Sequence, residues 1–149
     1  MRRILLIEDD QFKRDAINKV IASELSSTKI VEAHSVHAAV AEISAGTFDL
    51  LVLDMALPSH SVVAGESPAT SMLSGGLEVV MELAYLSRRD PIVVLTQYPE
   101  LEIEGELLAI PEAEERLRSM FGEPIRAVIH YEDQDSGWVT RLQDLLRGM

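Results

Sequence analysis

Short apolar runs alternate along the chain with stretches in which apolar residues recur every three or four positions. Residues 4–7, 50–53 and 92–95 are apolar throughout, and residues 127–129 have the same character. Uniformly apolar runs of this length are typical of strands that are buried on both faces of a sheet. Residues 29–33 form a more polar run, which predicts a strand near the edge of the same sheet.

The stretches between these runs have the spacing of amphipathic helices. Their apolar positions are Phe12, Ala16, Ile17, Val20 and Ile21; Val36, Val40 and Ile43; Leu77, Val80, Met81, Leu83 and Ala84; and Trp138, Leu142, Leu145 and Leu146. Asp135 or Ser136 is placed to cap the last of these helices. Strands that alternate with helices predict right-handed βαβ units, so we expect an α/β fold with a doubly wound, mostly parallel sheet.

Two segments interrupt this alternation. Between residues 59 and 76, ten of eighteen residues are Ser, Thr, Gly or Pro, which predicts a flexible insertion. Residues 99–121 form an acidic expansion with seven Glu between residues 100 and 115, and Pro111 is placed to open a helix within it. Neither segment resembles a linker between domains, and 149 residues suit one domain, so we expect residues 1–149 to form a single domain.

The composition limits the partners and the chemistry of the chain. It has 25 acidic and 13 basic residues, with a formal net charge of −12, and nucleic acid is therefore not expected as a direct partner. Cysteine is absent, which excludes disulfides, thiolate nucleophiles and Cys-based zinc sites. No apolar run approaches the roughly 20 residues of a membrane-spanning helix, so we expect a cytoplasmic protein that does not insert into a membrane.

Polar side chains follow four of the predicted strands at their carboxyl ends. These ends meet at one edge of a parallel sheet, where ligand sites form. With no lysine nearby, several carboxylates at this edge would repel one another, so we expect a divalent cation, and oxygen ligands favour Mg²⁺. For Asp10, capping of the following helix is the competing interpretation. The side chains at the strand ends are Glu8, Asp9, Asp10, Asp54, Thr96 and His130.

The order and spacing of these residues resemble the receiver domain of two-component response regulators. The matching segments are residues 4–10, residues 51–54 with Pro58 four positions later, Gly76-Leu77-Glu78, and residues 93–96. The resemblance covers most of the chain. It implies a flavodoxin-like three-layer sandwich whose five parallel strands lie in the order 2-1-3-4-5.

The same resemblance implies a role for each of the matching polar residues. Asp54 would accept a phosphoryl group, and Glu8 and Asp9 would hold Mg²⁺ together with Asp54. A backbone carbonyl at Met55 or Ala56 would add a further metal ligand. Thr96 corresponds to the hydroxyl residue that turns toward the phosphoryl group.

Two positions depart from the family pattern. Receiver domains usually carry a Lys followed by Pro at the end of the last strand, where the Lys pairs with the phosphoryl group, but this chain has His130 and Tyr131 there. A neutral imidazole offers one hydrogen-bond donor and no charge. Either a protonated His130 takes the place of the Lys, or phosphorylation is weakened. The family's aromatic switch position corresponds to Ala127, which is too small to move between a buried and an exposed state.

These observations support three functions. The first is a stand-alone receiver in a phosphorelay. Its partners would be a histidine kinase or phosphotransfer protein, an unknown downstream protein and a second copy in a homodimer. The alternative is a degenerate receiver that binds a protein irrespective of phosphorylation. A phosphohydrolase ranks third because its general acid would stand two residues after the nucleophile, where this chain has Ala56. We therefore expect no enzymatic activity beyond phosphorylation and dephosphorylation of Asp54.

Overall fold

The central element of the fold is a five-stranded parallel sheet. The computed structural model describes residues 1–58, 71–72 and 75–149. The strands of the sheet are β1 (Arg2–Ile7), β2 (Thr28–Ala33), β3 (Leu50–Leu53), β6 (Ile92–Thr96) and β9 (Ile125–His130). Their order is β2-β1-β3-β6-β9, so the predicted order and the predicted edge position of the second strand are confirmed.

The register of the sheet brings the polar strand ends together. Ile7 lies beside Leu53 in the β1/β3 pair, and Thr96 lies beside His130 in the β6/β9 pair. The backbone N–H of Asp54 donates to the carbonyl of Ile7 at 3.0 Å, which fixes the residue after β3 against the end of β1. The carboxyl ends of these strands therefore form one continuous edge.

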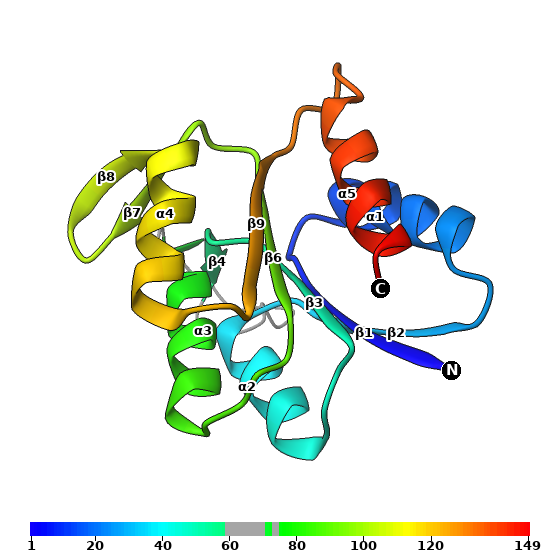
Figure 1. The fold of residues 1–149 in the computed structure, drawn as a ribbon, viewed down its shortest axis with the longest axis horizontal. Coiled ribbons are helices and arrows are strands. Elements are labelled where there is room, and N and C mark those ends of the chain that lie inside the picture. The colour runs from blue at the N-terminus through cyan, green and yellow to red at the C-terminus, as the bar shows by residue number, and fades with distance from the viewer. Residues whose placement is uncertain (59–70, 73–74) are drawn as a thin grey trace, which may run out of the picture.

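Helices cover both faces of the sheet, as Figure 1 shows. One face carries α1 (Gln11–Glu24) and α5 (Gly137–Arg147), and the other carries α2 (Val36–Ala45), α3 (Gly75–Tyr85) and α4 (Ile110–Phe121). Successive strand residues point to opposite faces, so Leu5 and Ile7 pack with the second group of helices and Ile4 and Leu6 with the first. The predicted three-layer α/β sandwich is confirmed. No helix in the described ranges is both long and apolar enough to cross a membrane.

The acidic expansion folds into a hairpin and a helix. The hairpin consists of β7 (Glu100–Ile103) and β8 (Glu106–Ala109), which are antiparallel, and it lies beside α4 at one end of the molecule (Figure 1). Leu101, Ile103 and Leu108 are buried in the core beneath α2, α3 and α4. Pro111 lies in the first turn of α4, as predicted.

The predicted flexible insertion falls largely outside the described residues, since residues 59–70 and 73–74 are not among them. At its borders, β4 (Leu57–Pro58) pairs with β5 (Ser71–Met72) in an antiparallel arrangement. Gly75 and Gly76, which we assigned to the insertion, instead form the start of α3.

The sequence-based assignment of helix faces was wrong at three residues. Phe12 is 68 % exposed, and Met81 and Ala84 are exposed on α3. In α1 the buried residues are Lys13, Ile17, Val20 and Ile21. Ile17, Val20 and Ile21 are buried as expected, so the difference in α1 is confined to its first turn, where Lys13 and not Phe12 shares the buried face. A lysine therefore lies on the face of α1 that packs against the sheet.

Candidate functional site

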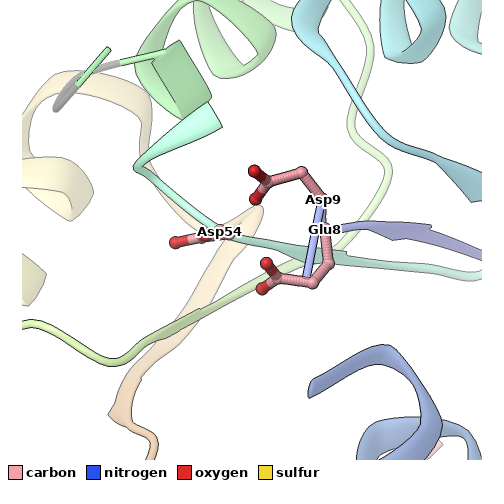
Figure 2. A group of neighbouring side chains, drawn as sticks. All are labelled: Glu8, Asp9 and Asp54. Carbon is pink, nitrogen blue, oxygen red and sulfur yellow. The ribbon is translucent and has the colours of Figure 1, made fainter. Parts of the chain in front are cut away.

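Three carboxylates converge where β1 and β3 end. Glu8 and Asp9 directly follow β1, Asp54 directly follows β3, and one carboxylate oxygen from each lies within 4.8 Å of the other two. In Figure 2 the three side chains extend to the same side of the strand ends. Glu8 and Asp54 are buried, whereas Asp9 is exposed. The structure thus brings together the three residues that we expected to bind a metal.

Burial disfavours the charged forms of the two inner carboxylates. Removal from water raises the pKa of Glu8 to about 8, and the neighbouring Asp54 carboxylate adds to this effect, although Lys13 opposes it. Burial likewise raises the pKa of Asp54. Oδ1 of Asp54 accepts a hydrogen bond from the Ala56 N–H at 3.2 Å, but the buried Oδ2 has no hydrogen-bond partner among the described residues.

This group of oxygens fits a hard divalent cation. Mg²⁺ is usually bound by one or two carboxylates together with water and phosphate oxygens. Asp9 faces solvent, which leaves room for water, while the unpartnered Oδ2 of Asp54 offers a buried ligand atom. A cation here would favour the ionised forms that burial disfavours.

A lysine that our sequence analysis did not assign to the site lies among these carboxylates. Nζ of Lys13 is 2.6 Å from Oε1 of Glu8 and 3.8 Å from Oδ1 of Asp54. It also donates hydrogen bonds to the Leu95 carbonyl at 2.7 Å and to Oε1 of Gln97 at 2.9 Å. The assumption that the carboxylates have no lysine nearby was therefore wrong. The spacing of Lys13 to Ile17 and Ile21 is the sequence signal that indicates its burial.

Asp10 does not belong to the three-carboxylate group. It is the N-cap of α1, and its carboxylate accepts hydrogen bonds from the N–H groups of Phe12 at 2.9 Å and Lys13 at 3.4 Å. The capping interpretation of Asp10 is therefore confirmed. The cap also fixes the first turn of α1, from which Lys13 extends toward the carboxylates.

Thr96 and His130 lie at the same edge of the sheet but make different contacts. The Thr96 side chain is fully buried, and its Oγ1 accepts a hydrogen bond from the Tyr98 N–H at 3.1 Å. Nε2 of His130 lies 3.1 Å from the Gln97 carbonyl, and Nδ1 lies 3.1 Å from Oε1 of Glu132. Among the described residues, the cation within ion-pair distance of the carboxylate group is thus Lys13 and not His130.

The chain that follows Asp54 packs closely against the start of α3. The Met55 carbonyl accepts a hydrogen bond from the Gly76 N–H at 2.8 Å. A Cβ atom on Gly76 would lie 2.5 Å from the Asp54 carbonyl oxygen and 2.7 Å from Cα of Met55. Because Gly76 has no side chain, the start of α3 can pack directly against the backbone of Asp54 and Met55. Ala56, the other residue expected to offer a carbonyl to the metal, is buried beside it.

Comparisons with known proteins identify the family of this chain. The family model of the response regulator receiver domain matches residues 4–113. The Detocs response regulatory protein DtcB of Vibrio alginolyticus is 33 % identical over 150 residues, which cover 97 % of this chain and 99 % of that protein.

Solved structures of receiver domains have the same fold. The response regulator TrrA of Thermotoga maritima, crystallised in complex with Mg²⁺-BeF, matches with a TM-score of 0.58 and 20 % identity over 98 % of this chain and 99 % of that one. A CheY-like receiver domain protein of Methanospirillum hungatei matches with a TM-score of 0.65 and 16 % identity over 99 % and 95 % of the two chains. Together with the family model and the relative, these observations show that the chain belongs to the response regulator receiver domains, whose members are phosphorylated on an aspartate.

Proposed function

We propose that Asp54 is the phosphoacceptor of this receiver domain and that Glu8, Asp9 and Asp54 bind Mg²⁺ there, together with the backbone carbonyl of Ala56. The observation that carries the proposal is the buried Oδ2 of Asp54, which has no hydrogen-bond partner among the described residues. A buried carboxylate oxygen without a partner is costly. Its retention is explained if the atom bonds to a ligand when the protein works.

The reaction that fits this site is transfer from a phosphohistidine of a histidine kinase or phosphotransfer protein. A carboxylate oxygen of Asp54 forms a bond to phosphorus while the phosphorus–nitrogen bond of the donor breaks, and the electron pair of that bond stays on the imidazole nitrogen. Bound Mg²⁺ would neutralise charge on the phosphoryl oxygens. The proposal includes Thr96, whose hydroxyl would turn from the Tyr98 N–H to the phosphoryl group, and His130, which holds the Gln97 carbonyl beside the site.

The wider role in this proposal is that of a cytoplasmic signalling module. Its donor would be a histidine kinase or phosphotransfer protein, and its output would pass to a downstream protein or a second copy of the chain. Nucleic acid and membrane insertion have no part in the proposal, and neither does turnover beyond phosphorylation and dephosphorylation of Asp54.

Incubation with a small-molecule phosphodonor and Mg²⁺ tests the proposal. Intact-protein mass measurement should detect one added phosphoryl group in the wild type and none in Asp54→Asn. Asp15→Asn is a matched control, because Asp15 is an exposed aspartate on α1 outside the carboxylate group. Modification of Asp54→Asn at the wild-type level would refute the proposal.

The alternative function, binding of a partner irrespective of phosphorylation, is favoured by two observations. Ala127 is small and buried at the expected aromatic switch position, and His130 contacts Gln97 and Glu132. The acidic hairpin β7/β8 would then offer the binding surface for a basic partner. If Asp54→Asn retains full partner affinity and full signalling in cells, this alternative is correct, and if the substitution abolishes both, it is not.

A further inference from the structure

Lys13 is a buried cation that belongs to a helix and yet contacts the ends of three strands. Its ammonium group reaches Glu8 after β1, Asp54 after β3, and the carbonyl of Leu95 in β6. A cation in the first turn of a helix faces the positive end of the helix dipole. Its position in α1 is therefore unfavourable unless negative groups at the strand ends hold it there.

The hydrogen-bonding capacity of Lys13 is already used. An ammonium group has three donors, and three oxygens lie at 2.6 to 2.9 Å, from Glu8, Leu95 and Gln97. Asp54, at 3.8 Å, is outside hydrogen-bond distance. A new acceptor on Asp54 can engage Lys13 when one of the three present partners is released. Glu8 is the partner that has another cation available, because it is also a proposed ligand of Mg²⁺.

A phosphoryl group on Asp54 supplies such an acceptor. It adds three strongly accepting oxygens and a charge of about −1.5 to −2. Among the described residues, Lys13 is the cation within ion-pair distance of Asp54. Both the added charge and the short distance favour a move of the ammonium group from Glu8 toward the phosphoryl oxygens.

Lys13 also contacts an aromatic pair that connects it to α5. Nζ of Lys13 lies over the ring of Tyr131, 5.5 Å from its centroid, and the ring of Tyr131 contacts that of Trp138 with centroids 4.9 Å apart. Both aromatic rings are buried. Trp138 lies in α5, which packs against α1. A shift of Lys13 therefore changes the surroundings of an aromatic pair between these two helices.

We infer that Lys13, supplied by α1, binds the phosphoryl group on Asp54 and that its movement is transmitted through Tyr131 and Trp138 to the surface formed by α1 and α5. The inference rests on the proposed function of Asp54. Lys13 acts on the ligand directly, whereas Tyr131 and Trp138 transmit the change.

Beryllofluoride with Mg²⁺, a mimic of the phosphoryl group, allows both steps to be measured. Trp138 is the single tryptophan of the chain, so its fluorescence reports on α5 without labelling. In the wild type, beryllofluoride with Mg²⁺ should shift this emission. Mg²⁺ alone should cause only a small part of the shift. Saturation of the shift gives the beryllofluoride affinity.

Lys13→Met should separate binding of the metal from binding of the phosphoryl mimic. Removal of the competing ammonium group should leave Mg²⁺ affinity equal or higher, while beryllofluoride affinity falls at least about tenfold because a charge-assisted contact is lost. Lys19→Met is the matched control, since Lys19 is an exposed lysine of the same helix, and it should behave like the wild type. Retained Mg²⁺ binding shows that Lys13→Met is folded.

Two further variants keep the inference testable. Tyr131→Leu should bind beryllofluoride but lose most of the Trp138 shift, and an unchanged shift would overturn the proposed route. If His130→Ala loses beryllofluoride affinity while Lys13→Met retains it, the assignment of the phosphoryl contact to Lys13 is overturned. A wild type that neither binds beryllofluoride nor is phosphorylated would instead refute the proposed function of Asp54, so the two failures are distinguishable.

Discussion

Oε1 of Glu8 lies 2.6 Å from Nζ of Lys13, and both side chains are almost completely buried, with 1 % and 2 % of their surfaces exposed. The positive charge of Lys13 favours the ionised form of Glu8, whereas burial favours its protonated form. The carboxylate oxygens of Glu8 have two competing partners. Glu8 holds Lys13, and it is a proposed ligand of Mg²⁺.

The burial of Glu8 predicts an unusual pH dependence of stability. Its pKa is raised from an ordinary value near 4.5 to about 8 by burial, so between these values the folded state retains a proton that the unfolded state has lost. The free energy of unfolding without Mg²⁺ should therefore fall as the pH rises through this window. The proposed Mg²⁺ ion would bind the ionised carboxylate, so its stabilising effect should increase over the same window.

Thermal unfolding at about pH 6 and about pH 9, with and without Mg²⁺, measures this effect. A difference of ~1 kcal/mol shifts the Tm of a domain of this size by roughly 2–4 °C, which is measurable. Glu8→Gln is the control, because the neutral amide should abolish both the pH dependence in this window and most of the gain from Mg²⁺. An equal gain from Mg²⁺ at both pH values in the wild type would contradict the role assigned to Glu8.

The cap at Asp10 should affect stability more than metal binding. Asp10→Ala removes the acceptor of the Phe12 and Lys13 N–H groups, and loss of an N-cap costs about 1 kcal/mol in the free energy of unfolding. Since Asp10 is not one of the three converging carboxylates, its replacement should change Mg²⁺ affinity by less than a few-fold. Denaturant unfolding and Mg²⁺ titration measure the two quantities.

Asp10→Ser is the matched control, because Ser also caps helices and should restore most of the lost stability. If Asp10→Ala and Asp10→Ser both lose Mg²⁺ affinity by tenfold or more, Asp10 is a metal ligand and the separation between cap and ligand is wrong.

The parts of this structure that were predictable from the sequence are those that local rules determine. The uniformly apolar runs mark buried strands, and in a parallel sheet the residue after each strand necessarily lies at the common edge. That rule alone placed Glu8, Asp9 and Asp54 together. The same rule could not predict that Lys13 lies among them, because it applies to residues at strand ends and Lys13 lies in a helix.

Lys13 was missed because hydrophobicity patterns treat a lysine as a surface residue. Phe12 was expected on the buried face and Lys13 outside, since apolar burial normally stabilises a helix against a sheet. In the structure the carboxylates and the Leu95 carbonyl make burial of the lysine favourable, and Phe12 is exposed. Such a reversal depends on side chains that are distant in sequence, and it occurs at the candidate functional site, the kind of place where local rules are expected to fail.

Arg88 lies shortly before β6, at the end of the sheet opposite the carboxylates. It should contribute to the stability of the fold but not to Mg²⁺ binding. Its guanidinium pairs with the buried Asp90 at 2.8 Å and donates to the carbonyls of Ile43 and Gly46. Arg88→Ala would leave a buried carboxylate without its cation, so we expect a loss of about 3 kcal/mol in the free energy of unfolding. Mg²⁺ affinity, measured by titration below the unfolding transition, should remain at the wild-type level.

Arg89→Ala is the control for Arg88, because the neighbouring Arg89 is largely exposed and lies 3.6 Å from the exposed Glu123. An exposed ion pair contributes little, so stability should change by less than about 0.5 kcal/mol. Similar losses for Arg88→Ala and Arg89→Ala in denaturant unfolding would show that the contacts around Asp90 do not stabilise the fold as proposed.

Gly76 connects the packing of α3 to the chemistry at Asp54. In Gly76→Ala the new Cβ would lie 2.5 Å from the Asp54 carbonyl oxygen, so the backbone after β3 or the start of α3 must shift. We expect a loss of about 1–3 kcal/mol in stability, as for other overpacked sites, and slower phosphorylation of Asp54 by a small-molecule donor.

Gly137→Ala is the matched control at the start of α5, where the nearest atom is Oδ1 of Asp135 at an ordinary 3.5 Å. That variant should keep or slightly gain stability, because Ala favours helices over Gly. A Gly76→Ala protein that is phosphorylated as fast as Gly137→Ala would show that the site tolerates displacement of the chain behind Asp54.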